Sequence, residues 1–217
     1  MRQFAVIGMS SFGYYLCKNL TERGHQVMAV DRDQAKVESV QNFVERAVIA
    51  DAADKETLSK LGIHEFDVVI VCLGAHIDAS ILATLHLKEL GVKEIWVKAM
   101  TEDHGKVLHM IGANSVVFPE RDMAERVALS LSSSNVLDHI PLAAGFSIME
   151  LAPPSDFLGK TLGELDLPKK YGVMVLVIKE LIPENVVSMP SSTYRIKDSD
   201  ILVITGKDSD LKKLQSL

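Results

Sequence analysis

Short apolar runs alternate with stretches of helical periodicity through the first half of the chain. The runs predict a strand that begins at Phe4, a second that ends at Asp31, and four more at Ala47–Ala50, Val68–Leu73, Glu94–Lys98 and Ser115–Phe118. Between them the pattern predicts helices after Gly8 and at Asp33–Phe43, Asp54–Leu61, Ile77–Leu90, Glu102–Ile111 and from Pro119 through Leu131. Strands that alternate with helices are typical of an α/β fold with a Rossmann-like, doubly wound parallel sheet.

The pattern changes after Ser132–Asn135, the most linker-like stretch in the chain. Beyond it we expect strands at Phe146–Leu151, Val173–Lys179, Val186–Ser188 and Asp200–Gly206, a short helix at Gly159–Leu165 and a last helix at Asp208–Leu217. This predicts two domains, residues 1–134 and a small α+β C-terminal subdomain at 135–217. So small a domain usually buries its remaining apolar surface by pairing with another copy.

The stretch from Phe4 to Asp31 resembles half of a mononucleotide-binding βαβ unit. Gly8 would let the chain turn out of the first strand, and Gly13 would let the helix approach the sheet with its free N–H groups aimed at a phosphate. Asp31 follows at roughly the ~20-residue distance at which a carboxylate accepts hydrogen bonds from a ribose. Ser10 replaces the middle glycine of the usual motif. The alternative is an ordinary crossover that carries two glycines.

Composition narrows the class of protein. The 217 residues are 47% hydrophobic and 24% charged, which is typical of a soluble globular protein. A net charge of -6 without basic clusters argues against nucleic acid as a partner. No apolar run approaches the ~18 residues that span a bilayer, so we expect a cytoplasmic protein that reaches a membrane only through a partner. The two cysteines, Cys17 and Cys72, are interpreted as buried thiols.

Many short motifs in order make the chain resemble the regulatory subunits of the Trk/Ktr potassium-uptake family, which are built from RCK (regulator of K⁺ conductance) domains. In the first half they are V-I-G-x-x-x-F-G, A-V-D-R, A-D-A, V-C-L-G-A, W-V-K-A, I-G-A-N and F-P-E-R-D-M-A, and in the second S-N-V-L-D, L-G-K-T-L-G-E-L, K-Y-G-V and I-L-V-I-T-G. The resemblance implies a regulator without enzymatic activity. It implies a homo-oligomer, a dimer at least and a ring of eight, that gates a potassium channel subunit in the membrane.

The resemblance also implies a set of ligand-binding residues. For an adenine nucleotide, ATP or ADP and with AMP or NAD as alternatives, they are Gly8, Ser10, Ser11, Phe12, Gly13, Asp31, Arg32, Asp51, Ala52, Gly74, Ala75, His76 and Lys98. Glu120 matches a carboxylate placed near a divalent cation between subunits. Relatives that sense ATP carry a basic residue at the position of Ser11, so we expect weak discrimination between ATP and ADP.

In the C-terminal subdomain, the resemblance implies a two-fold interface that receives cyclic di-AMP. Val175 and Pro190 would form its apolar wall. The arginine of the family falls at Pro168, so the phosphate contact would have to come from Lys169 or Lys170. A pairing interface without ligand is the alternative.

Two other functional classes remain open at this stage. An NAD-dependent oxidoreductase would use the same fold, and Tyr14-x-x-x-Lys18 imitates the catalytic pair of short-chain dehydrogenases. That pair, however, lies on the first helix beside the phosphate loop, and no nucleophile and base occur together elsewhere. His104 and His109 do not share a helix face, which disfavours a metal pair. A freestanding adenylate sensor unconnected to transport is the third class.

Overall fold

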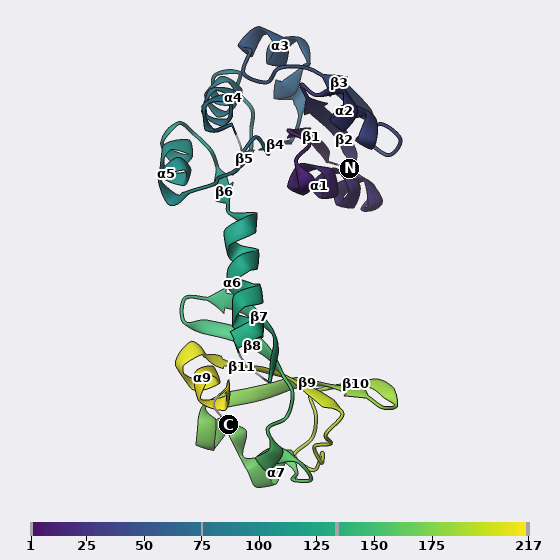
Figure 1. The fold of residues 1–217 in the computed structure, drawn as a ribbon, viewed down its shortest axis with the longest axis vertical. Helices are drawn as coiled ribbons and strands as arrows, with labels where there is room; N and C mark the ends of the chain where they lie inside the picture. Colours follow the sequence, from purple (N-terminus) through teal and green to yellow (C-terminus); the bar gives the residue numbers. More distant parts are fainter. Residues whose placement is uncertain (1, 75, 133–134, 216–217) are drawn as a thin grey trace. The chain divides into compact units, whose positions relative to one another are not determined.

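The computed structural model describes residues 2–74, 76–132 and 135–215 (Figure 1). The chain consists of two compact units, residues 1–119 and 120–217. The linker predicted at 132–135 includes two residues outside the described ranges, and the domain boundary predicted after residue 134 stays a prediction.

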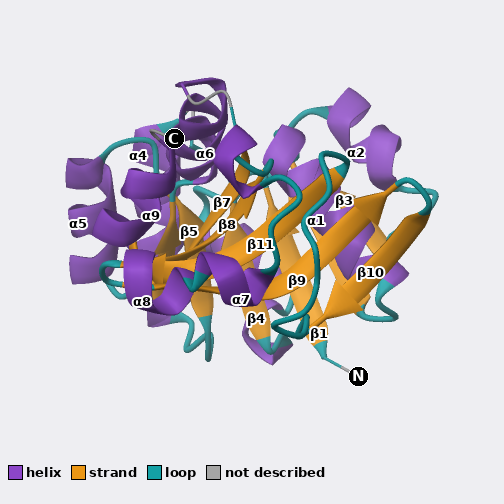
Figure 2. Ribbon diagram, turned by 90° about the horizontal axis from the view of Figure 1, so that it is seen from below, coloured by secondary structure: helices purple, strands orange, loops and turns teal. Residues whose placement is uncertain are grey.

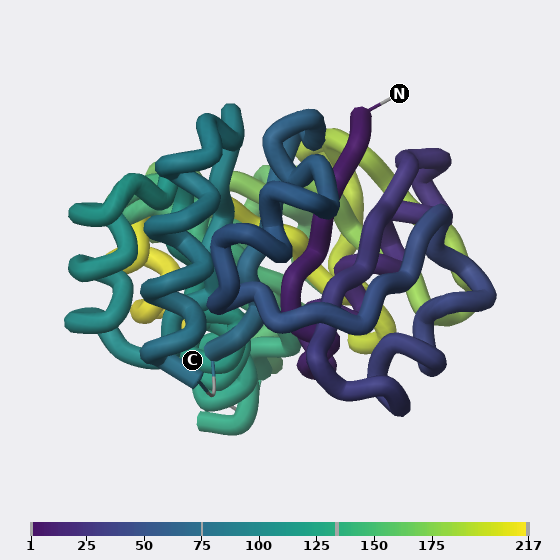
Figure 3. Tube along the Cα trace, turned by 90° about the horizontal axis from the view of Figure 1, so that it is seen from above, coloured from purple at the N-terminus to yellow at the C-terminus, as the bar shows by residue number. Residues whose placement is uncertain are grey.

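The first unit is the predicted doubly wound α/β domain. Its elements are β1 Gln3–Ile7, α1 Ser11–Glu22, β2 Gln26–Asp31, α2 Gln34–Val40, β3 Arg46–Ile49, α3 Lys55–Lys60, a 3₁₀ turn Ile63–Glu65, β4 Val68–Val71, α4 Ile77–Glu89, β5 Ile95–Lys98, α5 Glu102–Met110 and β6 Ser115–Val117. The six strands are parallel in the order β3-β2-β1-β4-β5-β6. In Figure 3 the purple strand β1 lies between the dark-blue elements that follow it and the teal elements that come later. The order therefore reverses between β1 and β4, where ligands bind in such sheets.

Each face of this sheet has its own apolar core, because successive strand residues point to opposite faces. On one face, Ile7 and Val71 pack in a core with Leu58 of α3, Leu87 of α4 and Leu108 of α5. On the other face, the core holds Val6, Val27 and Ile70 with Cys17 of α1 and Val40 of α2. Three helices thus cover the first face and two the second, and the second face is left partly open over β5 and β6.

The second unit is the predicted α+β subdomain, and its helices and strands are distinguished by colour in Figure 2. Its elements are α6 Pro119–Ser132, which starts at the last residue of the first unit, β7 Val136–Ala143, β8 Phe146–Leu151, a 3₁₀ turn Ser155–Phe157, α7 Leu162–Leu165, α8 Leu167–Tyr171, β9 Val173–Leu181, β10 Glu184–Ser188, β11 Asp200–Lys207 and α9 Asp208–Gln215. The antiparallel sheet has the order β10-β9-β11-β8-β7. Leu151, Ile178 and Leu202 pack there against Leu211 and Leu214 of α9.

Two elements of this unit were missed by the sequence patterns. Strand β7 contains Pro141 and lacks clean alternation, since its register with β8 shifts between Val136 and Asp138 and again between Pro141 and Ala143. It is tolerated because β7 is an edge strand, where a residue without an N–H leaves a ladder bond unmade at little cost. Helix α8 is short and follows α7 directly, so its sequence is too short to show a helical period.

Candidate functional site

The turn that follows β1 is built so closely that two of its positions admit only glycine. Gly8 has φ of 95°, and a Cβ there would lie 2.9 Å from the Leu73 side chain and 3.0 Å from the Cys72 backbone. A Cβ on Gly13 would lie 2.1 Å from the carbonyl oxygen of Gly8. Helix α1 therefore starts in contact with the turn, as the glycine spacing predicted.

The N-terminus of helix α1 lies at this turn. Ser10 is the N-cap, and its Oγ accepts a hydrogen bond from the Gly13 N–H at 3.4 Å. The first turn contains no acidic residue, Ser11 is exposed and Phe12 is half-buried. The dipole and the remaining first-turn N–H groups favour an anion here. Ser10 thus takes one N–H for itself, a use of the middle position that the sequence reading had not assigned.

Asp31 closes the same turn from the end of β2. It is 7% exposed, its Oδ2 accepts a hydrogen bond from the Met9 N–H at 2.6 Å, and its Oδ1 accepts one from the Asp33 N–H at 2.9 Å. Each carboxylate oxygen has a second lone pair, so acceptor capacity is left for a ribose hydroxyl. The carboxylate therefore fixes the glycine turn in addition to the role expected for it.

The β4–α4 connection lies over a buried lysine. Lys98 at the end of β5 is 6% exposed, and a Cβ on Gly74 would lie 3.3 Å from Lys98 Cε and 2.9 Å from Met100 Sδ. The stem of Lys98 therefore passes directly against the Gly74 backbone. Met100 belongs to this wall and was not predicted. Ala75, the other residue expected here, lies outside the described residues.

Arg32 and His76 come together from opposite sides of the switch in strand order. Arg32 follows β2, His76 precedes α4, and Nη2 of the arginine lies 3.2 Å from Nε2 of the histidine. The guanidinium can only donate, so the histidine nitrogen is the acceptor. Both side chains are exposed. We call the group formed by residues 8–13, Asp31, Gly74 and Lys98 the switch-point site. Arg32 and His76 lie close to two of its members in the sequence, because Arg32 directly follows Asp31 and His76 comes two residues after Gly74.

The remaining predicted residues are less central. Asp51 follows the outer strand β3, is exposed and accepts a hydrogen bond from the Ala53 N–H at 2.9 Å, whereas Ala52 is buried. Glu120 lies in α6, in the second unit. Among the described residues no group of three or more His, Cys, Asp or Glu side chains could hold a metal ion. The cation near Glu120 therefore stays a prediction.

The second unit contains a cleft that we call the C-terminal cleft. It is lined by Leu162, Gly163, Asp166, Leu167, Pro168, Met174, Val175, Pro190 and Ser192. Val175 and Pro190 both line this cleft, and their role as the wall of a ligand site stays a prediction. Lys169 and Lys170 are not among the lining residues, and Nζ of Lys170 instead donates to the carbonyl oxygen of Glu164 at 3.3 Å. The phosphate contact expected from these lysines has no support in this geometry.

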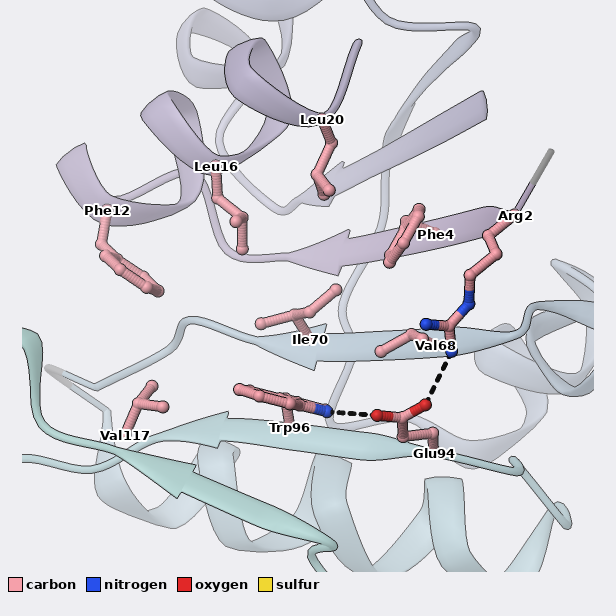
Figure 4. A pocket seen from close by; sticks show the side chains of 10 residues that line it. All are labelled: Arg2, Phe4, Phe12, Leu16, Leu20, Val68, Ile70, Glu94, Trp96 and Val117. Carbon is pink, nitrogen blue, oxygen red and sulfur yellow. Dashed lines mark hydrogen bonds and ion pairs between the residues drawn. The ribbon is translucent and has the colours of Figure 1, made fainter. Parts of the chain in front are cut away.

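The open part of the first unit's sheet forms an apolar groove that sequence reasoning missed. Figure 4 shows side chains of α1 along one side and of β1, β4, β5 and β6 along the other; the lining residues are Arg2, Phe4, Phe12, Leu16, Leu20, Val68, Ile70, Glu94, Trp96 and Val117. At one end, Glu94 accepts hydrogen bonds from Trp96 Nε1 at 2.8 Å and from Arg2 Nη2 at 2.7 Å. Both hydrogen bonds lower the pKa of the Glu94 carboxyl, and the bond from Trp96 has the larger effect. We call this surface the α1 groove.

The chain is similar to known proteins in both of its units. The TrkA-N domain family matches residues 4–119 and the TrkA-C domain family matches residues 146–217. The chain is 44% identical over 214 residues to the Ktr system potassium uptake protein C of Bacillus subtilis (strain 168), which covers 99% of this chain and 96% of that protein. The chain belongs to the TrkA family of potassium uptake proteins.

Other relatives agree with this assignment. The Ktr system potassium uptake protein A of Vibrio alginolyticus is 40% identical over 217 residues, covering 100% of this chain and 98% of that protein. Among solved structures, the RCK domain of GsuK has a TM-score of 0.69 at 22% identity, over 100% of this chain and 47% of that one. The predicted family and fold class are confirmed. In the described parts of this Ktr-type protein, no helix has the length and apolar character that crossing a membrane requires.

Proposed function

We propose that this Ktr-type protein is the cytoplasmic, nucleotide-binding regulatory subunit of a potassium uptake system, without catalytic activity of its own. The observation that carries the proposal is the switch-point site. A glycine turn, a helix N-terminus whose first turn contains no acidic residue, and the buried carboxylate of Asp31 meet at the point where strand order reverses. Adenine dinucleotides and mononucleotides bind at such points.

The ligand proposed for this site is an adenine nucleotide. The phosphates would lie over the first turn of α1, where N–H groups and helix dipole attract negative charge. The ribose would face Asp31, whose carboxylate keeps lone pairs free. A structure of the same fold, the GsuK channel bound to NAD, has a TM-score of 0.70 at 20% identity. It supports the fold's capacity for such a ligand, and the choice among ATP, ADP, AMP and NAD belongs to the experiment.

The protein is proposed to act as a homo-oligomer: a dimer at least, assembled into a closed ring of eight. Two separate apolar surfaces support this. The α1 groove leaves Trp96 37% exposed. Helix α6 carries Met123, Val127 and Leu131 at successive turns, all of them exposed and on one face. A stripe of this kind on one copy is complementary in character to an open sheet face on another.

Helices α4 and α5 also carry exposed apolar side chains. They are Ile77, Leu82, Leu85, Val107 and Met110, of which Met110 is 86% exposed. When two different surfaces of one chain each bind a neighbouring copy, the copies form a ring if the rotation between them closes. A ring is also what a symmetric membrane channel subunit could use, so we propose that a ligand-dependent change of the ring is the gating signal to that partner.

A second ligand, cyclic di-AMP, is proposed for the C-terminal cleft. Val175 and Pro190 provide an apolar wall there for an adenine base. None of the described residues that line the cleft is a lysine or arginine, so we expect weak binding, with the phosphates facing solvent or a second copy. In the double variant Lys169→Ala, Lys170→Ala, affinity would fall only if a lysine reaches the ligand in the dimer.

Calorimetric titration of the full chain tests the main proposal. ATP, ADP, AMP and NAD are each titrated into the wild type, and binding of at least one at micromolar concentration is expected. Absence of heat with all four would refute nucleotide binding. The transport role is tested separately, by co-purification with a potassium channel subunit from membranes and by potassium uptake of cells that lack this chain; an uptake that does not change would leave only a freestanding nucleotide sensor.

A further inference from the structure

One wall of the C-terminal cleft is a loop, residues 189–199, that joins β10 to β11. Pro190 and Ser192 of this loop line the cleft. Leu162 and Gly163, which also line the cleft, are hydrogen-bonded to the loop: the Gly163 N–H donates to the Ser192 carbonyl at 2.7 Å and the Leu162 N–H donates to the Tyr194 carbonyl at 3.0 Å. A Cβ on Gly163 would lie 3.1 Å from the same Ser192 oxygen. The position of the loop therefore sets the width of the cleft.

Tyr194 attaches this loop to the sheet. Its hydroxyl lies 3.0 Å from Oε1 of Glu180 on β9 and 3.0 Å from Oδ2 of Asp200 on β11. Both carboxylates are buried, at 9% and 2% exposed. One hydroxyl proton thus lies between two carboxylates that would otherwise face each other as like charges.

Other polar groups around Tyr194 donate hydrogen bonds to the two carboxylates. Nζ of Lys197 donates to Glu180 Oε1, the Lys197 N–H donates to Asp200 Oδ2 at 2.9 Å, and Asn185 of β10 donates to Glu180 Oε2 at 2.7 Å. The bonds from Lys197, Asn185 and Tyr194 lower the pKa of Glu180 to about 2. Burial, with the two carboxylates, raises the pKa of Tyr194. The hydroxyl is therefore protonated and Glu180 ionised at physiological pH.

We propose that Tyr194 is a positioning residue for the C-terminal cleft: its hydroxyl, shared between Glu180 and Asp200, fixes the 189–199 loop and thereby the spacing at which the cleft accepts a nucleotide base. The inference rests on the proposed binding of cyclic di-AMP, and it adds a residue that does not touch the ligand. Without the hydroxyl the two carboxylates repel each other, the loop moves away from the sheet, and Ser192 moves with it.

Tyr194→Phe in the full chain tests this, because the variant keeps the ring and removes the shared hydroxyl group. The matched control is Tyr171→Phe, which removes a hydroxyl from another half-buried tyrosine of the same unit. Affinity for cyclic di-AMP is expected to fall about tenfold in Tyr194→Phe and to stay at the wild-type value in the control.

A second substitution separates positioning from a general loss of structure. In the double variant Tyr194→Phe, Glu180→Gln, two like charges no longer face each other, so affinity should recover toward that of Glu180→Gln alone. A loss in the double variant as large as in Tyr194→Phe would overturn the proposal.

Hydrogen exchange measured without ligand tests the role of Tyr194 separately from the binding of cyclic di-AMP. The amide of Gly163, which is bonded to Ser192, should exchange about tenfold faster in Tyr194→Phe than in Tyr171→Phe. If the wild type binds no cyclic di-AMP, the ligand is wrong and this exchange rate alone decides on Tyr194. Equal rates in the two variants would overturn the positioning role, as would equal affinities where the wild type does bind.

Discussion

The carboxylate of Asp31 and the backbone N–H of Met9 form a 2.6 Å hydrogen bond between the end of β2 and the turn after β1. This bond joins two residues 22 positions apart in the sequence, at the turn that leads into helix α1. An acid at this position consequently stabilises the phosphate turn itself, whether or not a ribose is present. Its substitution should affect the fold of the site and the binding of nucleotide together.

Asp31→Ala is therefore expected to weaken nucleotide binding by on the order of 1.5–3 kcal/mol, the value of hydrogen bonds to a charged group, and to lower stability as well. Asp33→Ala is the control. Asp33 caps α2 through bonds to Ala35 and Lys36, so its loss should cost about 1 kcal/mol of stability and leave affinity unchanged. Calorimetry of both variants measures the difference, and equal affinities would show that Asp31 does not face the nucleotide.

Ser11 carries no positive charge, so we expect the third phosphate of ATP to add little to the affinity. ATP and ADP should bind within about tenfold of each other in the absence of Mg²⁺. Ser11→Arg, at an exposed position in the first turn of α1, should shift that ratio about tenfold to a hundredfold toward ATP. A strong preference for ATP already in the wild type would mean that another group supplies the charge.

Gly13→Ala should disrupt the site, because the new Cβ would meet the Gly8 carbonyl oxygen at 2.1 Å and the backbone must move. We expect a loss of about 1–3 kcal/mol in stability, together with loss of nucleotide binding. Lys18→Ala, at an exposed position of the same helix α1, is the control. Urea denaturation followed by the fluorescence of Trp96, the single tryptophan, reports on this unit. A fully stable Gly13→Ala that binds nucleotide would contradict the packing described for the turn.

Assembly is tested by light scattering at micromolar concentration. The wild type should exceed the 23.8 kDa of one chain and approach the mass of a closed ring. Val127→Asp places a charge in the exposed apolar stripe of α6 and should reduce the assembled mass, whereas Glu125→Gln on the same helix should not. A wild type that scatters as a monomer would refute the proposed oligomer.

Glu180 gives a pH prediction for stability. Its pKa is lowered in the folded protein from an ordinary 4.5 to about 2. A lowered pKa stabilises the fold above the ordinary value, and this contribution disappears as pH falls toward the folded value. The difference in stability between wild type and Glu180→Gln should therefore be constant above about pH 5 and shrink between pH 4.5 and pH 2. Acid titration by circular dichroism measures it; a difference that persists at pH 2 would contradict the assignment.

The amino-acid pattern by itself determined the succession of most strands and helices, the parallel sheet, the small α+β subdomain and the glycine turn. These depend on local signals: the period of apolar residues, helix caps such as Asp33 and Asp54, and glycines at which a side chain cannot fit. The family also followed from short motifs in order. Strand β7 escaped because an irregular edge strand has no clean period.

Only the tertiary structure decided which distant groups meet. The pairing of Arg32 with His76 spans 44 positions, and the contact of Tyr194 with Glu180 and Asp200 requires the register of β9 with β11. The α1 groove exists because two helices cover a face that spans six strands. Each of these depends on strand order, register and crossing position, which are set by the packing of the whole unit and leave no trace in a local window of sequence.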